Sequence, residues 1–456
     1  MVKLARITPA LCVPVAAASL VRAQEPVVSG EATVPTVTAP APARVERSAD
    51  ALIALELKQA RREPRDLADV LAHSQGFSLR RQGGVGSETE ALLVGLPPAW
   101  LVDGVPLELL GFPLESLGVP LLLLERIDVY RGVLPVRLAS TTLGGAVNLV
   151  RDARYDSHAE ASYQLGSFHT HRAAASGRYR DAASSFFAGG SAYADITDND
   201  YAIDVEVPDA RGALSHVTVP RFHDAHHAYR VSVEGGVVDR PWAKRLRVEA
   251  FAARFDKELQ HDASMRVPYG EARYGQTSFG ATAHYDVELG SDVTLDVVAS
   301  YARQIDDFVD RSEWVYDWYG ARIVRRRAGG GEIGPLPIDS EQTRDGVFGR
   351  ALASWRLAPE HSLRVSITPW WTTQRAAGVS SASSYVSLVS GIEYQWDLSG
   401  GVLTSVVFVK DYVYAASGPA LERPNERRDV SANLHRLGGG RAARAADAVA
   451  RPLCLV

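Results

Sequence analysis

The chain has 456 residues, a formal net charge of −5 at pH 7 and 23% charged residues. Its length predicts two or more structural units. The acidic balance argues against a nucleic-acid-binding protein, and two cysteines, Cys12 and Cys454, leave no disulfide framework or thiolate metal site.

The first 23 residues have the organisation of an export signal. Lys3 and Arg6 precede an apolar stretch from 7 to 20, and Val21-Arg22-Ala23 places small residues at the spacing of a cleavage site. We therefore expect residues 1–23 to be a signal peptide. Beyond it, the sequence contains no apolar run long enough for a membrane-spanning helix.

Residues 24–47 are rich in proline, alanine, valine and threonine, and almost free of large apolar side chains. Such a segment cannot bury enough surface to fold alone, so we expect an extended tether. In an extended segment the N–H groups of Val34, Thr36 and Thr38 share one edge, and Pro35 removes a donor only from the other. The intact edge suits pairing with a partner strand, although a plain exported linker is the alternative.

From Ser48 onward, the sequence has the apolar periodicity of a folded domain. After Asp66, the residues Leu67, Val70 and Leu71 form one apolar face at helical spacing, and a short strand is expected to follow. The glycine-rich run 83–86 lacks the Lys-Ser/Thr of a nucleotide-binding loop, so no phosphate cradle is predicted. Further on, Asp103-Gly104 separates two strand-like runs, which predicts a tight hairpin turn.

Two apolar runs, Arg126–Tyr130 and Ala146–Val150, predict the closing strands of this first unit. Gly132 allows a positive φ where the chain leaves the first strand, and Gly144-Gly145 allows a close backbone approach before the second. The side chains expected in the core are Ile127, Val129, Val147 and Leu149.

From about residue 154 to 422, apolar and polar residues alternate, with Tyr or Trp near the ends of the predicted strands. This pattern is typical of a transmembrane β-barrel, and a soluble β-sandwich is the alternative. We expect about eleven strands between residues 157 and 415. Tight turns are predicted at 290–292, 358–361 and 398–401, and long polar excursions at 196–226, 260–273 and 307–342.

The order of these motifs resembles the plug domain and the first part of the barrel of TonB-dependent outer-membrane receptors. The resemblance rests on ERIDVYRG at 125–132, GGAVNL at 144–149 and LVDGVPL at 101–107. It implies a small α/β plug over 48–153, followed by antiparallel barrel strands over 154–422. The plug-motif residues that it identifies are Asp103, Gly104, Arg131, Gly132, Gly144, Gly145 and Asn148.

The resemblance also implies a function. The protein would be a receptor of the cell outer membrane, not an enzyme, and would take up a scarce small-molecule ligand, most often a ferric siderophore in this family. Its implied partners are a TonB-type energy transducer and outer-membrane lipid, with no cofactor and no nucleic acid. The candidate coupling residues, in the segment that resembles a TonB box, are Val34, Thr36, Val37 and Thr38.

The excursion 307–342 holds the candidate ligand-binding residues. Its aromatic faces and guanidinium groups suit a flat, anionic cargo, whereas the alternative is a hairpin whose aromatic residues mark the membrane interface. These residues are Trp314, Tyr316, Trp318, Arg325, Arg326 and Arg327. Clustered imidazoles with a nearby carboxylate can bind a transition metal, but we expect a solvated loop and no metal site at His216, His223, Asp224, His226 and His227.

Several features depart from the family. Val94 stands where an arginine is usual, the segment between Leu96 and Asp103 is short, and Leu138-Ala139 replaces an aromatic-glycine pair. A plugged transporter barrel closes with about 22 strands, so we expect this barrel to be incomplete. Residues 423–456 show no strand pattern and are expected to form an aberrant tail. The alternatives are a truncated, non-transporting fragment and a passive porin or surface adhesin.

Overall fold

The computed structural model describes residues 51–443, with gaps at 64, 115, 133, 139–141, 143, 152–154, 209–210, 263, 378–380, 399–402 and 419–429. The side chains at 51–52, 326–329, 398, 403–404 and 430–443 also lie outside this description. The predicted signal peptide and tether, with Val34, Thr36, Val37 and Thr38, fall outside the described residues.

The first unit is a small mixed α/β domain, as predicted, and we call it the plug. Five strands form one sheet in the order β1-β6-β7-β4-β5, in which β4 and β7 are parallel and the other neighbours antiparallel. A separate hairpin consists of β2 and β3. The elements are β1 (Ala51–Glu56), η2 (Ala60–Arg62), α1 (Leu67–Ala72), β2 (Phe77–Arg81), β3 (Thr89–Leu93), β4 (Ala99–Val102), β5 (Val105–Pro106), η3 (Leu107–Leu110), η4 (Leu121–Leu123), β6 (Arg126–Arg131) and β7 (Ala146–Val150).

The helix α1 begins where the sequence predicts. Asp66 caps it, because its carboxylate accepts the N–H of Asp69, and the Asp69 carboxylate accepts the N–H of Asp66 in return. This reciprocal capping box satisfies backbone donors that the first helical turn leaves free. Leu67 and Leu71 are fully buried against the plug core, so capping and the apolar face together explain the helix.

The closing strands β6 and β7 pair through the centre of the plug sheet. Ile127, Val129, Val147 and Leu149 are all 0% exposed, which confirms their predicted burial. Gly132 has the predicted positive φ of 76°. At Gly145, where φ is 94°, a Cβ atom would lie 2.1 Å from the carbonyl oxygen of Tyr130, so only glycine fits this approach.

The Asp103-Gly104 motif forms the expected tight turn between β4 and β5. Both residues have positive φ, 50° and 79°, as a type I′ hairpin turn requires. A hydrogen bond to this turn explains why Asn148 on β7 belongs to the motif: its side-chain oxygen accepts the N–H of Gly104 at 2.8 Å. Val94, the departure from the family pattern, also has a positive φ in the turn after β3, and β4 still forms.

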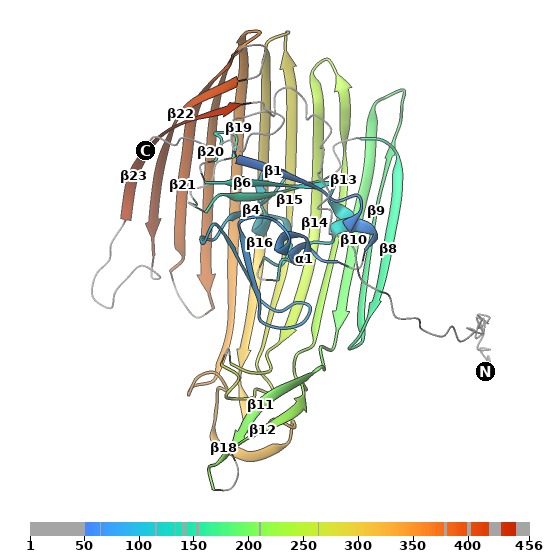
Figure 1. Cartoon of the computed structure of the whole chain (residues 1–456), viewed down its shortest axis with the longest axis vertical. Coiled ribbons are helices and arrows are strands. Elements are labelled where there is room, and N and C mark those ends of the chain that lie inside the picture. The colour runs from blue at the N-terminus through green and yellow to red at the C-terminus, as the bar shows by residue number, and fades with distance from the viewer. Residues whose placement is uncertain are drawn as a thin grey trace, which may run out of the picture. The chain divides into compact units, whose positions relative to one another are not determined.

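The second unit is a long antiparallel sheet of twelve strands (Figure 1), ordered β23-β22-β21-β20-β19-β16-β15-β14-β13-β10-β9-β8. Eleven of these strands lie between residues 158 and 417, which agrees with the prediction. The strands are β8 (His158–Gly166), β9 (Thr170–Arg180), β10 (Phe186–Thr197), β13 (His226–Arg240), β14 (Ala243–Glu258), β15 (Arg273–Leu289), β16 (Val293–Asp310), β19 (Ile338–Ala358), β20 (His361–Ala376), β21 (Ser383–Leu398), β22 (Leu403–Ser417) and β23 (Val430–Ala443).

Strand β23 corrects one expectation. The sequence from 423 onward is predicted to lack strands, yet the backbone of Val430–Ala443 pairs with β22 over its whole length. An edge strand offers a row of unpaired N–H and C=O groups, and these can pair with a neighbour whatever its side-chain pattern. Alternation of side chains therefore underestimates the extent of the sheet.

The long sheet alternates as a membrane barrel should. On β20, Val365 and Ile367 are 43% and 47% exposed, whereas Arg364 and Ser366 are 6% and 2% exposed. Directly paired residues of neighbouring strands lie on the same face, so the apolar face continues from strand to strand. Exposed aromatic side chains on this face include Trp355, Trp371, Tyr394 and Trp396.

The long connections 198–225, 259–272 and 311–337 lie at one end of the sheet, which we call the long-loop end (Figure 1). The tight turns after β13, β15 and β19 lie at the other end, whereas the short turn between β8 and β9 lies at the long-loop end. Two hairpins lie within the long connections. One consists of β11 (Ala202–Pro208) and β12 (Leu214–Pro220), and the other of β17 (Ser312–Tyr316) and β18 (Arg322–Gly330). None of the described helices has the length and apolar character needed to cross a membrane.

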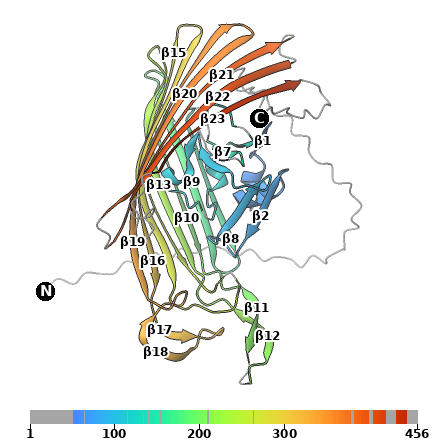
Figure 2. The ribbon, with the colours of Figure 1, turned by 90° about the vertical axis from the view of Figure 1, so that its left-hand side faces the viewer.

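The plug lies on the face of the sheet that carries the polar side chains (Figure 2). Three hydrogen bonds illustrate the contact: Arg230 Nε donates to the carbonyl of Leu110 at 2.9 Å, Ser366 Oγ to the carbonyl of Val136 at 2.7 Å, and the N–H of Val136 to Glu393 Oε2 at 3.2 Å. The described strands therefore enclose the plug with their hydrophilic face and turn their apolar face away from it.

Candidate ligand site

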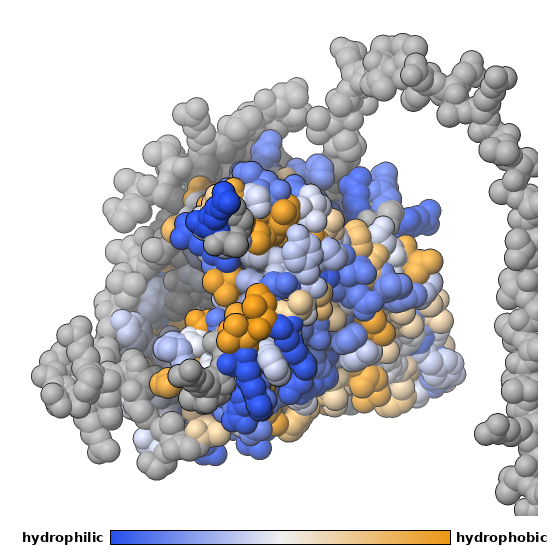
Figure 3. Space-filling model, turned by 90° about the horizontal axis from the view of Figure 1, so that it is seen from below, coloured by the Kyte–Doolittle hydropathy of each residue, from blue (hydrophilic) through white to orange (hydrophobic). Residues whose placement is uncertain are grey.

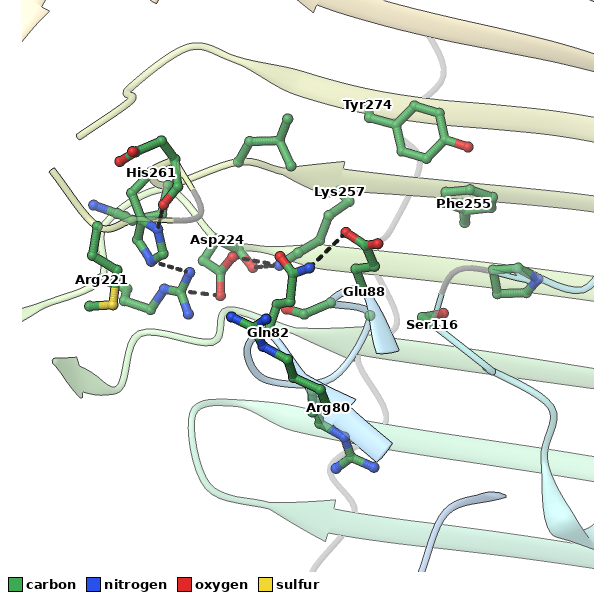
Figure 4. Close-up of a pocket in the computed structure, with 18 residues that line it drawn as sticks. Arg80, Gln82, Glu88, Ser116, Arg221, Asp224, Phe255, Lys257, His261 and Tyr274 are labelled. Atoms are coloured by element: carbon green, nitrogen blue, oxygen red, sulfur yellow. Dashed lines mark hydrogen bonds and ion pairs between the residues drawn. The ribbon is translucent and has the colours of Figure 1, made fainter. Parts of the chain in front are cut away.

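A cavity of about 420 Å³ lies between the plug and the long-loop end of the sheet (Figure 4). The plug contributes the β2–β3 hairpin and residues near Ser116, and the sheet contributes β14, β15 and the connections beside them. Figure 3 views the molecule from this end, where hydrophilic side chains surround smaller apolar patches.

The plug wall of the cavity carries Arg80, Gln82 and Glu88, which Figure 4 shows on the β2–β3 hairpin. Gln82 Nε2 donates to Glu88 Oε2 at 3.0 Å, so this carboxylate is occupied. Arg80 is exposed and has no ion-pair partner among the described residues. Its guanidinium is thus available to an anion, and its planar donor array suits carboxylate-like oxygens.

The opposite wall is built around Asp224. Its carboxylate lies 2.7 Å from Lys257 Nζ and 3.3 Å from Arg221 Nε, and all three side chains are buried. Burial raises the pKa of Asp224 above its ordinary value, although Lys257 and Arg221 oppose this shift. One carboxylate therefore lies between two cations, Arg221 and Lys257.

His261 completes this wall and is held in its neutral form. Its Nδ1 lies 2.7 Å from the carbonyl oxygen of Asp262 and so carries the proton, while its Nε2 accepts from Arg221 Nη2 at 3.0 Å. Burial lowers the pKa of His261, and the nearby Arg221 acts in the same direction. Arg221 is thus fixed from two sides, by Asp224 and by the imidazole.

Two aromatic rings add an apolar surface to the cavity. Phe255 and Tyr274 meet edge to face, with centroids 5.3 Å apart at 69°. Four cationic and three acidic side chains line the cavity in total: Arg80, Arg81, Arg221 and Lys257 against Glu88, Asp224 and Asp262. This combination can hold an anionic ligand that also has a flat or apolar part.

The residues predicted from the 307–342 excursion lie elsewhere. Tyr316 donates its hydroxyl to Glu271 Oε1 at 2.6 Å, and Trp318 is buried in a small cluster with Val205 and Val219. Arg325 is exposed and pairs with Glu313. Trp314 packs against Arg322, and the side chains of Arg326 and Arg327 lie outside the description. Those that are described do not line the cavity, and their role in binding stays a prediction.

The histidines of the 216–227 segment are dispersed. His216 lies on β12 beside Glu206, His223 contacts the carbonyl of Ala272, and His226 is buried at the start of β13 next to His227. Within the described part of the chain, no group of three or more His, Cys, Asp or Glu is placed to hold a metal ion. Asp224, singled out with them, instead joins the cavity wall.

A buried ion-pair network fixes the plug to the sheet. Arg151, just after β7, lies 2.7 Å from Asp103 and 2.5 Å from Glu249 on β14, and Arg247 lies 3.6 Å from Asp103. Burial opposes ionisation of Asp103, but Arg151 and Arg247 outweigh it and hold its pKa below the ordinary value. Asp103 thus has two roles: it forms the turn between β4 and β5, and it pairs with arginines of the plug and of the sheet. The sequence alone does not reveal the second role.

Comparison with known proteins identifies the fold. No protein-family model matches the sequence, and neither does any curated protein. Solved structures do match. They include the copper transporter OprC (14% identity, TM-score 0.64, 88% of this chain and 63% of that one), the FrpB iron transporter of Neisseria meningitidis (13%, 0.63, 86% and 62%) and FpvA of P. aeruginosa bound to pyoverdines (10%, 0.65, 88% and 55%).

The described residues thus have the architecture of a plugged β-barrel, in which a small domain packs against the polar face of long antiparallel strands. The barrel is incomplete in the described residues, as predicted, because the twelve strands form an open sheet with β8 and β23 at its edges. Among plugged β-barrels, the chain has the fold of the TonB-dependent outer-membrane receptors, as the sequence motifs predict. The solved structures of this fold are named as transporters and receptors, not as enzymes. The chain spans 63%, 62% and 55% of the length of the three structures named above.

Proposed function

We propose that the chain is a TonB-dependent receptor of the outer membrane that binds an anionic, partly planar ligand for energy-coupled uptake, with a ferric siderophore as the first candidate. The observation that carries this proposal is the cavity where the exposed Arg80 faces the same space as Phe255 and Tyr274. Solved proteins of this fold are named as a siderophore receptor and as iron and copper transporters, which supports this ligand class.

The proposal assigns each segment a role. Residues 1–23 direct export, 24–47 form the tether, 48–153 the plug and 154–422 the strands of the barrel. The outward face of those strands contacts lipid. The TonB-type transducer pairs with the tether at Val34, Thr36, Val37 and Thr38, and its pull remodels the plug so that ligand can pass. The tight polar contacts between plug and sheet favour this gated route over a passive porin.

Equilibrium binding tests the site. The purified full chain would be titrated with three probes: a ferric trihydroxamate, a ferric triscatecholate and ferric citrate. One exposed charged contact contributes about 0.5–1 kcal/mol, so Arg80→Ser should weaken binding of the preferred probe by roughly two- to fivefold. Arg62→Ser is the matched control, because Arg62 is an exposed plug arginine that does not line the cavity.

A second variant separates this cavity from the region indicated by the sequence. Changing Arg325, Arg326 and Arg327 together to serine removes the basic run on β18. If the triple variant loses affinity while Arg80→Ser binds as the wild type does, the ligand is held on the outer hairpin and not in the cavity. If no probe binds the wild-type chain, this ligand class is wrong.

A further inference from the structure

Three connections lie at the long-loop end, and two of them form the barrel-side wall of the cavity together with β14 and β15. We call them loop A (198–225), loop B (259–272) and loop C (311–337). Loop A contributes Arg221 and Asp224 to the wall, and loop B contributes Gln260, His261 and Asp262. Loop C, which carries β17 and β18, contributes no lining residue. Its relation to the cavity is therefore indirect.

Glu332 of loop C holds loop B by its backbone. Its carboxylate accepts three consecutive N–H groups, from Gly270 at 2.8 Å, Glu271 at 2.8 Å and Ala272 at 2.9 Å. The residue is 9% exposed. Hydrogen bonds to an ionised acceptor are stronger than neutral ones, and burial shields them from water. Glu332 is therefore the main polar link between loops B and C.

Glu332 is itself fixed from the barrel. Asp310, the last residue of β16, is fully buried, and its carboxylate accepts the N–H groups of Glu332 at 2.5 Å, Ile333 at 3.1 Å and Gly334 at 3.1 Å. Because β16 belongs to the long sheet, this second carboxylate anchors loop C to the rigid part of the molecule. The barrel thus holds loop C, and loop C holds loop B.

Gln260 extends the same chain of contacts to loop A. Its side-chain oxygen accepts the N–H groups of Phe222 and His223, both at 2.7 Å, and the residue is 1% exposed. These two residues lie directly between Arg221 and Asp224 in the sequence. A displacement of loop B would therefore move the backbone that carries both charged residues of the cavity wall.

We propose that Glu332 is the positioning residue of the candidate ligand cavity. It lies behind the wall, touches no lining side chain through its carboxylate, and sets the wall's position through loop B and Gln260. The consequence for ligand affinity rests on the proposed function, whereas the consequence for the loops does not. Tyr316, one of the residues predicted to bind ligand, acts in the same way, since its hydroxyl holds Glu271.

Amide hydrogen exchange of the purified full chain tests this without a ligand. In Glu332→Gln the carboxylate loses its charge and presents an NH₂ group toward backbone donors. We expect peptides covering 270–272 and 222–223 to exchange at least tenfold faster than in the wild type, a change that corresponds to about 1.4 kcal/mol. Glu313→Gln is the control, because Glu313 lies in the same loop but is exposed and pairs only with Arg325 among the described contacts.

The outcomes separate the alternatives. Faster exchange at both segments, with Glu313→Gln unchanged, supports the proposal. Faster exchange at 270–272 alone would show that Glu332 stabilises only loop B, and this result would overturn the proposal. No change at either segment would overturn it as well. If Glu332→Gln does not fold, Glu332→Asp is measured instead, since it keeps the charge but is one methylene too short to reach all three amides.

A binding experiment then connects the loops to the ligand. If the wild type binds one of the ferric probes, Glu332→Gln should lower its affinity about tenfold while leaving Arg80 and the plug untouched. Unchanged affinity despite faster exchange would overturn the positioning role. Failure of every probe to bind wild-type protein would count against the proposed ligand, and the exchange result would still decide the role of Glu332 in the loops.

Discussion

At the scale of single residues, the two glycines that flank the closing strands of the plug differ in what they tolerate. At Gly145 a Cβ would lie 2.1 Å from the Tyr130 carbonyl, whereas at Gly132 nothing lies within 4 Å of that position. Gly132→Ala should cost only the strain of a positive φ, about 1–2 kcal/mol. Gly145→Ala must also displace backbone, so it should cost more than about 3 kcal/mol. Urea unfolding of both variants measures this, and equal costs would contradict the close approach.

The ion pair at Asp103 makes a pH-dependent contribution. Because Arg151 and Arg247 hold the pKa of Asp103 below its ordinary value, its stabilisation is complete above about pH 4 and declines as the pH falls through the lowered pKa. Asp103→Asn keeps the turn, since asparagine also tolerates positive φ. We expect the stability difference between the two proteins to be constant from pH 5 to 7 and to shrink below pH 4. A difference that grows on acidification would refute this assignment.

At the scale of elements, the outward face of β20 provides a test of membrane placement. Ile367 lies on this exposed apolar face near the middle of the strand. Ile367→Arg should destabilise the barrel in lipid by about 2–4 kcal/mol, as expected for a charge near the bilayer midplane, and Ile367→Ala should cost far less. Folding titrations in lipid vesicles measure both. Equal stability of the two variants would argue that this face does not contact hydrocarbon.

The strands and the plug were largely predictable because each follows from local pattern. Alternation alone indicates eleven strands, and the spacing of Leu67 and Leu71 indicates α1. Strand β23 was missed because it pairs through backbone groups rather than through a side-chain pattern. The resemblance identifies Asn148 as a motif residue, but only the structure shows why asparagine stands there. Its side-chain oxygen accepts a hydrogen bond from the N–H of Gly104, 44 positions earlier in the chain.

The cavity was not predictable for a related reason. Its residues come from separate stretches of the chain, and Arg80 and Lys257 line the same cavity although they lie far apart in the sequence. The sequence drew attention to Tyr316 and Trp318, which lie outside this cavity: the Tyr316 hydroxyl donates to Glu271, and Trp318 is buried with Val205 and Val219. The composition of a loop therefore does not indicate which of its side chains line a cavity.

At the scale of the whole molecule, the proposed function places the plug between a ligand site at the long-loop end and a coupling segment at 24–47. Two ion pairs tie the plug to β14 of the sheet: Arg151 with Glu249, and Arg247 with Asp103. Breaking a buried pair on one side typically costs about 3–5 kcal/mol, so the plug should not open without external work. In the proposed function, this stability is the reason that uptake would require an energy transducer.

The measurement that tests this most directly is uptake of iron-55 supplied as the ferric probe that binds best, in cells producing the full chain. Cells with and without a TonB-type transducer would be compared, together with a variant carrying Val34→Pro and Thr36→Pro. We predict accumulation that requires the transducer and is abolished by the double substitution, with surface binding unchanged in each case. Accumulation at the same rate without the transducer, or binding that never leads to accumulation, would contradict it.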